Sequence, residues 1–278
     1  MIQKSYEKNI YGNLYLVPTP IGNLEDITLR AINTLKMVDM VYAEDTRETI
    51  NLLKHYDINK KIESCHKYTE MKHKDKIIRL LKEGKNIAYV TDRGTPLISD
   101  PGNVIVDECI KNNINVISLP GPNALLPALN MSGISNERFL FFGFLNSKKT
   151  LAKKQLLKLK NITVPIIFYE SPYRLKNTIE IMYEILGSRK ASIIREISKI
   201  HEEIIRSNLP NLINECNNIK GEIVIIVAGN NNDEEENINY KEKVIEYVEK
   251  GYSKRDAIKK ISLEYNINKN KIYNEVKE

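Results

Sequence analysis

Short apolar stretches recur along the first part of the chain, and a longer amphipathic segment separates each stretch from the next. The apolar stretches lie at 14–18, 40–44, 62–66, 87–91 and 115–120. The segments between them carry apolar residues at the i, i+3, i+4 and i+7 spacing of a helix with one buried face. Strands that alternate with helices and are almost continuously apolar are typical of a mostly parallel sheet covered on both faces. The pattern therefore predicts an α/β lobe over residues 1–120.

The pattern changes after residue 120. Strand-like stretches follow at 138–145, 164–170, 191–199, 201–207 and 221–229. Several of them are joined by short connections, and longer helices are expected only near 148–160 and 174–187. Because short connections join antiparallel neighbours, we expect a second α/β lobe over 121–229 with more antiparallel pairing than the first.

The C-terminal part differs in composition from both lobes. Residues 230–239 are polar and acidic without periodicity, which predicts a linker. Residues 240–278 are basic, and their apolar spacing predicts a small bundle of short helices. Ser253 and Asn268 are suited to cap two of these helices at their N-termini.

Several classes of protein are disfavoured by what the sequence lacks. No apolar run reaches the length of a membrane span, and the N-terminus has no apolar signal-peptide core. Cys65, Cys109 and Cys216 form no C-x-x-C pair, and the histidines show no metal-ligand spacing, so we expect neither a disulfide framework nor a metal site. These features favour a reducing cytoplasm. The net charge of +6 is compatible with an RNA or phosphate-bearing partner.

Proline and glycine gather where the predicted strands end. The prolines in question are Pro18, Pro20, Pro96, Pro101, Pro120, Pro122 and Pro172. The carboxyl ends of strands carry the ligand site in α/β sheets, and loops rich in Gly and Pro let backbone groups approach a ligand closely. A single loop such as DRGTPLISDPG (92–102) also fits an ordinary strand–turn–helix corner in which Asp100 caps the next helix. Four such loops favour a backbone-lined pocket.

The sequence motifs of the common nucleotide-binding sites are missing. The chain contains no G-x-G, no G-x-x-x-x-G-K-[ST] and no G-x-S-x-G. A nicotinamide or flavin site of the Rossmann type and a P-loop are therefore disfavoured. A ligand without phosphates, held by backbone through an adenine, a ribose and an amino acid, fits better. S-adenosylmethionine is a ligand of that kind.

A resemblance covers almost the whole chain in order. It is carried by the stretches 14–31, 43–47, 92–102, 119–125, 139–145, 168–175, 195–203 and 221–229 and by the helical end at 251–273. The chain resembles the tetrapyrrole-methylase superfamily of two-lobed, class III methyltransferases. Within it, the chain is similar to the ribosomal RNA methyltransferases that 2′-O-methylate a cytidine in the decoding region of 16S rRNA. PIGNLEDITLRA and AEDTR are the stretches most specific to this branch.

The resemblance implies a cofactor, partners and site residues. S-adenosylmethionine is expected between the lobes without a metal, the substrate is 16S rRNA or the small ribosomal subunit, and the protein is a homodimer. Carried over by motif, the cofactor-binding residues are Pro20, Arg93, Thr95, Ile98, Asn123, Ala124, Glu170 and Ser171. Arg93 stands where the family usually has a small residue. Either only its backbone touches the cofactor, or its side chain enters the cleft and contacts RNA or blocks it.

Methyl transfer from a sulfonium to a ribose hydroxyl needs alignment and a proton acceptor. Glu44 and Asp45 of AEDTR lie at a predicted strand end and are the first candidates for the acceptor, and Glu196 is another. Asp45 is alternatively the N-cap of a helix that starts near Thr46. Arg47 is then an RNA phosphate contact or a partner that keeps the carboxylates ionised.

An RNA substrate requires cations along its path. The candidates are Arg47, Lys148, Lys149, Arg174, Arg195, Lys199, Lys254 and Arg255. Each cluster alone is also compatible with a solvated surface. Two other functions remain open: a methyltransferase of the same fold that acts on a tetrapyrrole or another small molecule, and a non-enzymatic RNA-binding assembly protein.

Overall fold

The structure is a computed structural model of the chain. It describes residues 2–5, 7, 10–134, 137–216, 219–230, 240–264 and 269–276. The chain divides into two units, Met1–Asn230 and Asn231–Glu278, and each is described here by itself.

Five parallel strands form the first sheet, in the order β3-β2-β4-β1-β5. The strands are β1 Leu14–Leu16, β2 Met40–Ala43, β3 Lys61–Ser64, β4 Ile87–Val90 and β5 Val116–Ser118. Every residue of β2 and β4 is buried, which explains why these strands are apolar on both faces. The predicted parallel sheet is confirmed.

Helices cover both faces of this sheet. They are α1 Leu29–Met37, α2 Thr46–His55, α3 Glu70–Lys82 and α4 Asn103–Lys111, and a short 3-10 helix, η1, spans Leu24–Asp26. Helices α1 and α2 pack on one face, where Leu35 and Leu52 share a core with Val41. Helices α3 and α4 pack on the other face, where Ile77 shares a core with Tyr42. Successive strand residues thus point into different cores, as the period of a strand requires. We call the first sheet with these helices the first lobe.

The second sheet is mixed, in the order β6-β7-β10-β8-β9. Its strands are β6 Leu140–Phe144, β7 Ile166–Glu170, β8 Lys190–Arg195, β9 Glu203–Asn208 and β10 Ile223–Val227. Strands β6 and β7 are parallel, whereas the other three pairs are antiparallel. The expected antiparallel pairing is therefore confirmed, and for β8 and β9 it follows from a connection too short for a crossover.

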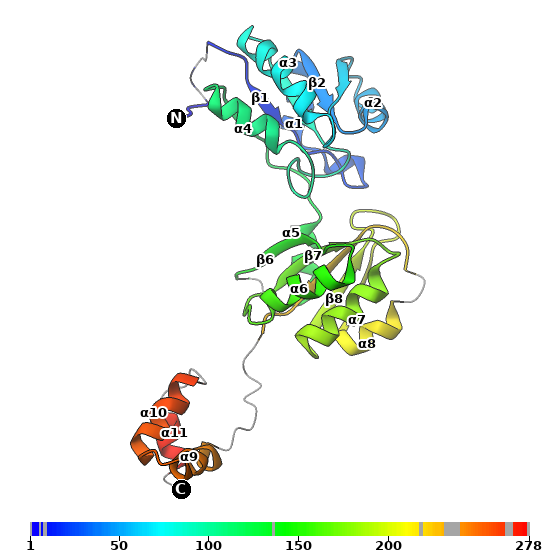
Figure 1. Cartoon of the computed structure of the whole chain (residues 1–278). Coiled ribbons are helices and arrows are strands. Elements are labelled where there is room, and N and C mark those ends of the chain that lie inside the picture. The colour runs from blue at the N-terminus through cyan, green and yellow to red at the C-terminus, as the bar shows by residue number, and fades with distance from the viewer. Residues whose placement is uncertain are drawn as a thin grey trace. The chain divides into compact units, whose positions relative to one another are not determined.

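The second sheet also has helices on both faces. They are α5 Leu125–Ser132, α6 Lys149–Leu159, α7 Leu175–Leu186 and α8 Leu209–Glu215. Helices α6, α7 and α8 lie along one side of the sheet (Figure 1) and share one core with it. Helix α5 packs on the opposite face, where Leu129 shares a core with Ile167 and Ile194. The apolar periodicity predicted α6 and α7 but not α5 and α8. We call the second sheet with these helices the second lobe.

The segment 119–124 connects β5 to α5 and so joins the two lobes within the first unit. The predicted division into domains 1–120 and 121–229 stays a prediction. Ile21, which follows β1 of the first lobe, packs in the same core as Ile194, Ile197 and Val224 of the second lobe. The two lobes therefore share buried apolar surface close to the strand ends where a ligand site was predicted.

The second unit contains the predicted short helices. They are α9 Tyr240–Glu249, α10 Lys254–Glu264 and α11 Lys269–Glu275, with Val244, Ile261 and Ile272 in a common core. The Ser253 hydroxyl accepts a hydrogen bond from the Asp256 N–H over 3.1 Å and caps α10 as predicted. Asn268 and, apart from Asn230, the predicted linker 230–239 lie outside the described residues. Among the described helices, none combines the length and the apolar character needed to cross a membrane.

Candidate active site between the lobes

The loop that follows β4 has a backbone unlike that of an ordinary turn. Gly94, Leu97, Ser99 and Gly102 all have φ between 70° and 128°, in or near the left-handed region. Residues other than glycine are held there at an energetic cost, and such positions concentrate at ligand sites. Gly94 exchanges two backbone hydrogen bonds of 2.9 Å with Thr19. The loop is thereby fixed against the loop that follows β1.

A first cavity of about 240 Å³ opens beside this loop. It is lined by Ile21, Arg93, Gly94, Thr95, Ile98, Ser99, Asp100, Asn123 and Ala124, and from the second lobe by Phe144, Tyr169, Glu170, Ile197, Glu222, Ile223 and Val224. The Thr95 hydroxyl donates a 2.9 Å hydrogen bond to the Pro122 carbonyl, so the loops after β4 and β5 are tied together at its edge. Six residues predicted to bind the cofactor thus surround one cavity: Arg93, Thr95, Ile98, Asn123, Ala124 and Glu170.

A second cavity of about 470 Å³ lies next to the first. Its lining includes Pro20, Asp92, Arg93 and Lys199 together with residues of α2. Pro20, which was predicted to flank the cofactor, is therefore placed in the second cavity and not in the first. Arg93 lines both cavities, and its side chain pairs with Glu222 of the second lobe.

Glu170 is a buried carboxylate at the end of β7. Its side chain is 1% exposed, and it accepts hydrogen bonds from the Thr178 hydroxyl at 2.6 Å and the Ser171 N–H at 2.8 Å. The Arg174 guanidinium lies 3.4 Å from it and also donates to the Leu145 carbonyl at 2.9 Å. These contacts give the buried charge the partners that it needs. Arg174, predicted as an RNA contact, is held in the fold by the same bonds.

Four carboxylates gather where β2 and β4 end: Glu44, Asp45, Asp92 and Asp100. The Thr91 hydroxyl donates to the Glu44 Oε2 atom over 3.1 Å, and the Asp45 N–H donates to the Asp92 Oδ1 atom over 2.7 Å. Burial, and then the charge of Asp92, raise the pKa of Glu44. Burial is also the main cause that raises the pKa of Asp100 to about 6, with further contributions from Glu44 and Asp92. A carboxyl group with a pKa of about 6, such as that of Asp100, can exchange protons near neutral pH.

Asp100 lines the first cavity and was not among the predicted site residues. The interpretation of Asp100 as a helix cap is wrong, because α4 begins after Gly102, which occupies the N-cap position without a side-chain bond. The sequence pattern offered no signal for its role, since an acid before Pro-Gly is common in turns. The structure assigns Asp100 to the site because its carboxyl is partly buried and lies near Glu44 and Asp92.

Asp45 caps α2, so this alternative is confirmed. Its Oδ1 atom accepts the Arg47 N–H over 2.8 Å, and its Oδ2 atom lies 2.5 Å from the Arg47 guanidinium. The side-chain bond with Arg47 and then the backbone bond lower the pKa of Asp45 to about 2. A carboxylate of that acidity is a weak base, so Glu44 is better suited than Asp45 to accept a proton. The roles of Asp45 in catalysis and of Arg47 in RNA binding stay predictions.

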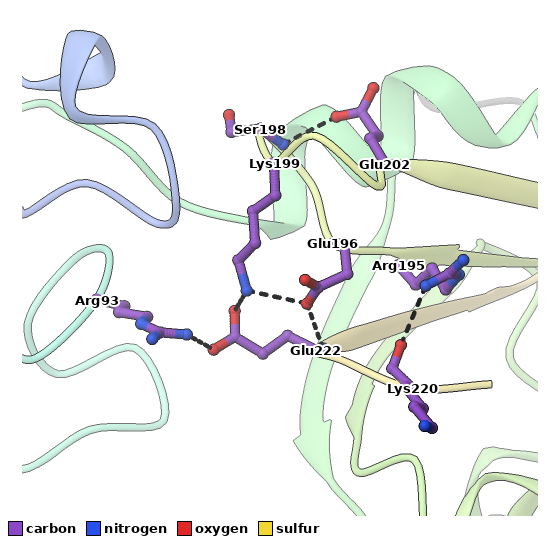
Figure 2. Close-up of polar contacts among 8 residues, drawn as sticks. All are labelled: Arg93, Arg195, Glu196, Ser198, Lys199, Glu202, Lys220 and Glu222. Carbon is purple, nitrogen blue, oxygen red and sulfur yellow. Dashed lines mark hydrogen bonds and ion pairs between the residues drawn. The ribbon is translucent and has the colours of Figure 1, made fainter. Parts of the chain in front are cut away.

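Glu196 belongs to an ion-pair network that spans the two lobes (Figure 2). Its Oε1 atom accepts the Glu222 N–H at 2.9 Å and lies 2.9 Å from the Lys199 ammonium. Burial raises the pKa of Glu196, but the Glu222 N–H and Lys199 together outweigh that effect and leave the pKa below its usual range. Lys199 and Arg93 both pair with Glu222. Glu222 is a site residue that the sequence prediction missed.

The remaining predicted RNA contacts lie in several places. Lys148 and Lys149 are exposed at the start of α6, and Lys254 and Arg255 are exposed at the start of α10 in the second unit. Arg195 forms an ion pair with Glu203 and donates to the Lys220 carbonyl over 3.4 Å. Within the described residues, His, Cys, Asp and Glu side chains form no cluster able to hold a metal ion.

Comparison with known proteins agrees with this architecture. The model of the family Tetrapyrrole (Corrin/Porphyrin) Methylases matches residues 13–213. A protein of Bacillus subtilis called ribosomal RNA small subunit methyltransferase I is 47% identical over 275 residues, which cover 96% of this chain and 94% of the relative. The protein of the same name from Halalkalibacterium halodurans is 43% identical over 281 residues, which cover 98% of this chain and 97% of the relative.

Solved structures show the same fold at much lower identity. Uroporphyrin-III C-methyltransferase from Thermus thermophilus, complexed with S-adenyl homocysteine, superposes with a TM-score of 0.58 at 18% identity, over 78% of this chain and 97% of that chain. A diphthine synthase superposes with a TM-score of 0.60 at 13% identity, over 78% and 90%. These two structures share the two-lobed architecture with this chain.

Proposed function

The chain belongs to the tetrapyrrole (corrin/porphyrin) methylase family, and we propose that it transfers a methyl group from S-adenosylmethionine to the RNA of the small ribosomal subunit. The observation that carries this proposal is the match, over nearly the whole chain, to relatives named for that activity. In its more specific form, the proposal is that the acceptor is the ribose 2′-hydroxyl of a cytidine in the decoding region of 16S rRNA. That form rests on the branch-specific stretches AEDTR and PIGNLEDITLRA.

The charge of the first cavity suits S-adenosylmethionine. Its lining contains three carboxyl groups, those of Asp100, Glu170 and Glu222, but only one guanidinium, that of Arg93. An excess of acids suits a ligand that carries a sulfonium. A Cβ on Gly94 would lie 3.4 Å from Ile21 Cγ2 and 3.7 Å from the Pro122 carbonyl, in contact with the wall of the cavity, and the φ of 83° at this position favours glycine.

When bound, S-adenosylmethionine supplies an electrophilic methyl group. The chain's own residues then have two tasks, alignment of the acceptor and removal of its proton. The apolar side chains of Ile98 and Phe144, together with the fixed loops after β4 and β5, shape the cavity. As the acceptor oxygen is methylated, its proton passes to a carboxylate of the Glu44–Asp100 group, whose raised pKa values suit that role.

The RNA is held by cations outside the first cavity. Arg47, Lys148, Lys149, Arg195 and Lys199 of the first unit, with Lys254 and Arg255 of the second, are proposed to contact its phosphates. A ribose inside a helix does not expose its hydroxyl to such a cavity, so we expect the target nucleotide to be splayed out. The proposal includes a cytoplasmic location, where small subunits are assembled, and a homodimer, which light scattering of the purified protein measures.

Transfer of label to alternative acceptors tests the proposal. The protein is incubated with methyl-labelled S-adenosylmethionine and with naked small-subunit RNA, unmodified small subunits or uroporphyrinogen III. We expect label in RNA that resists alkaline cleavage at one ribose, because a 2′-O-methyl group blocks the attack of the hydroxyl on the phosphate. Label in the tetrapyrrole alone supports the small-molecule methyltransferase. RNA binding without label in any acceptor supports the non-enzymatic assembly protein.

A further inference from the structure

Glu222 lies between two cations that come from different lobes (Figure 2). Its Oε1 atom pairs with the Arg93 guanidinium, which follows β4 of the first lobe, and its Oε2 atom lies 3.2 Å from the Lys199 ammonium, in the connection between β8 and β9. One carboxylate thus engages both cations, each through a different oxygen. A phosphodiester, with two charged oxygens, presents the same kind of acceptor.

We call the contact of Glu222 with Arg93 and Lys199 the bridge, and it lies where the two cavities meet. Arg93 and Glu222 line the first cavity, whereas Arg93 and Lys199 line the second. A nucleotide that enters the second cavity therefore meets both cations of the bridge before it reaches the first. The bridge must open if the backbone of the nucleotide is to be held there.

The parts of the bridge differ in how firmly they are held. The Lys199 side chain is 19% exposed, pairs with Glu196 at 2.9 Å and packs against Gly22, where any Cβ would collide with its stem. By contrast, the side chains of Arg93 and Glu222 are 48% and 56% exposed. If the Glu222 side chain moves away, the Lys199 ammonium still forms its ion pair with Glu196. The Arg93 guanidinium then becomes available to another anion.

Exposed ion pairs contribute little to stability. An arginine fork with a phosphate gains more, because it forms two parallel charge-assisted hydrogen bonds. We infer that Arg93 and Lys199 form a phosphodiester site for the target nucleotide, and that Glu222 occupies this site until RNA displaces it. The inference rests on the proposed RNA substrate, and it makes Glu222 a competitor of RNA and not only a strut between the lobes.

Binding of a short fluorescein-labelled single-stranded RNA, followed by anisotropy in low salt, tests the inference. Glu222→Gln removes the competing charge, so RNA binding should tighten about three- to tenfold. Arg93→Gln should weaken binding and lower the salt dependence by about 0.7 in the log–log slope. In the double variant Arg93→Gln/Glu222→Gln most of the gain should vanish, because the freed cation is absent.

Glu63→Gln is the matched control. Glu63 also bridges two cations, with 2.5 Å to the Lys76 ammonium and 3.5 Å to that of Lys61, but it lies on β3 and is not among the residues that line the two cavities. It changes the net charge by the same amount. We expect RNA affinity to change less than about twofold in this variant. Lys199→Gln provides a second test of the cation pair if Arg93→Gln does not fold.

Four results would overturn the inference. Unchanged or weaker RNA binding in Glu222→Gln would show that Glu222 links the two lobes and does not compete with RNA. Equal tightening in Glu63→Gln would reduce the effect to net charge. A gain in S-adenosylmethionine binding alone would assign the cations to the carboxylate of the cofactor. Absence of RNA binding in every variant would show that Arg93 and Lys199 do not form a phosphodiester site. None of these readouts requires methyl transfer, so failure of the proposed reaction is distinguished from failure of this inference.

Discussion

The Thr91 hydroxyl donates a hydrogen bond to the Oε2 atom of Glu44, 3.1 Å away, and so joins the ends of β4 and β2. Thr91 is 2% exposed, and its hydroxyl also interacts with Asp100. The carboxyls of Glu44 and Asp100 are therefore coupled through one buried side chain. Asp100 lines the first cavity, whereas Glu44 is not among the residues that line it, so Asp100 is the member of the pair that faces the cavity.

Asp100→Asn should slow methyl transfer about 10²–10⁴-fold, since the amide cannot accept a proton. In the unchanged protein the Asp100 pKa of about 6 predicts that the single-turnover rate falls as the pH drops through about 6, where the base becomes protonated. The variant should lose that limb of the pH–rate profile. A variant with the same profile as the unchanged protein would exclude Asp100 as the proton acceptor.

Asp100→Asn should also change stability in a pH-dependent way. Burial raises the folded-state pKa of Asp100 from 3.8 to about 6, so ionisation is unfavourable in the folded state. The stabilising contribution of the protonated Asp100 carboxyl is complete below pH 3.8 and is lost as the pH rises through about 6. Relative to the unchanged protein, the variant should gain unfolding free energy at pH 7.5, and the gain should shrink toward pH 5. Urea unfolding at both pH values measures this difference, and a gain independent of pH would contradict the assignment.

Thr178→Val should destabilise the second lobe. It removes the hydroxyl that donates to the Glu170 Oε2 atom over 2.6 Å and leaves this oxygen, on a side chain that is 1% exposed, with the longer 3.4 Å contact to the Arg174 guanidinium. Loss of a partner of a buried polar group costs about 1–3 kcal/mol. Thr178→Ser keeps the hydroxyl and serves as the control, with less than half of the loss. Equal losses in the two variants, in urea unfolding, would show that packing and not the hydrogen bond matters there.

Gly94→Ala should weaken binding of S-adenosylmethionine. Gly94 has a φ of 83°, and a Cβ there would point toward Ile21 and Pro122 at the wall of the first cavity. Gly84→Ala is the matched control, because Gly84 has a φ of 85° but no atom within 4 Å of its would-be Cβ. Both variants carry a backbone cost of about 1 kcal/mol. Only Gly94→Ala should raise the dissociation constant, and equal dissociation constants would exclude this wall from the site.

Much of the fold follows from local patterns in the sequence. Strands such as β2 and β4 are buried on both faces, so their composition alone distinguishes them from amphipathic helices. Helix α8 escaped prediction because it has seven residues, begins with Leu-Pro and directly follows β9. Helix α5, Leu125–Ser132, also escaped, because apolar residues occupy most of its positions and leave little periodicity.

The site was less accessible to sequence reasoning than the fold. The strand-end loops indicated a pocket, and the family resemblance named six of the residues that line the first cavity. Glu222 lies 129 positions after Arg93, and no spacing rule relates two residues on different lobes. Pro20 and Arg93 belong to motifs of one lobe, and the sequence gives no sign that Pro20 lines the second cavity while Arg93 lines both.

Calorimetric titration with S-adenosylmethionine tests the central claim, that the first cavity is the cofactor site. We predict saturable one-to-one binding that is abolished by Thr95→Arg, since Thr95 lines the cavity and its hydroxyl bonds to Pro122. Thr150→Arg, at an exposed position of α6, should bind as the unchanged protein does. Absence of saturable binding by the folded protein at millimolar cofactor, with and without small-subunit RNA, would contradict the account.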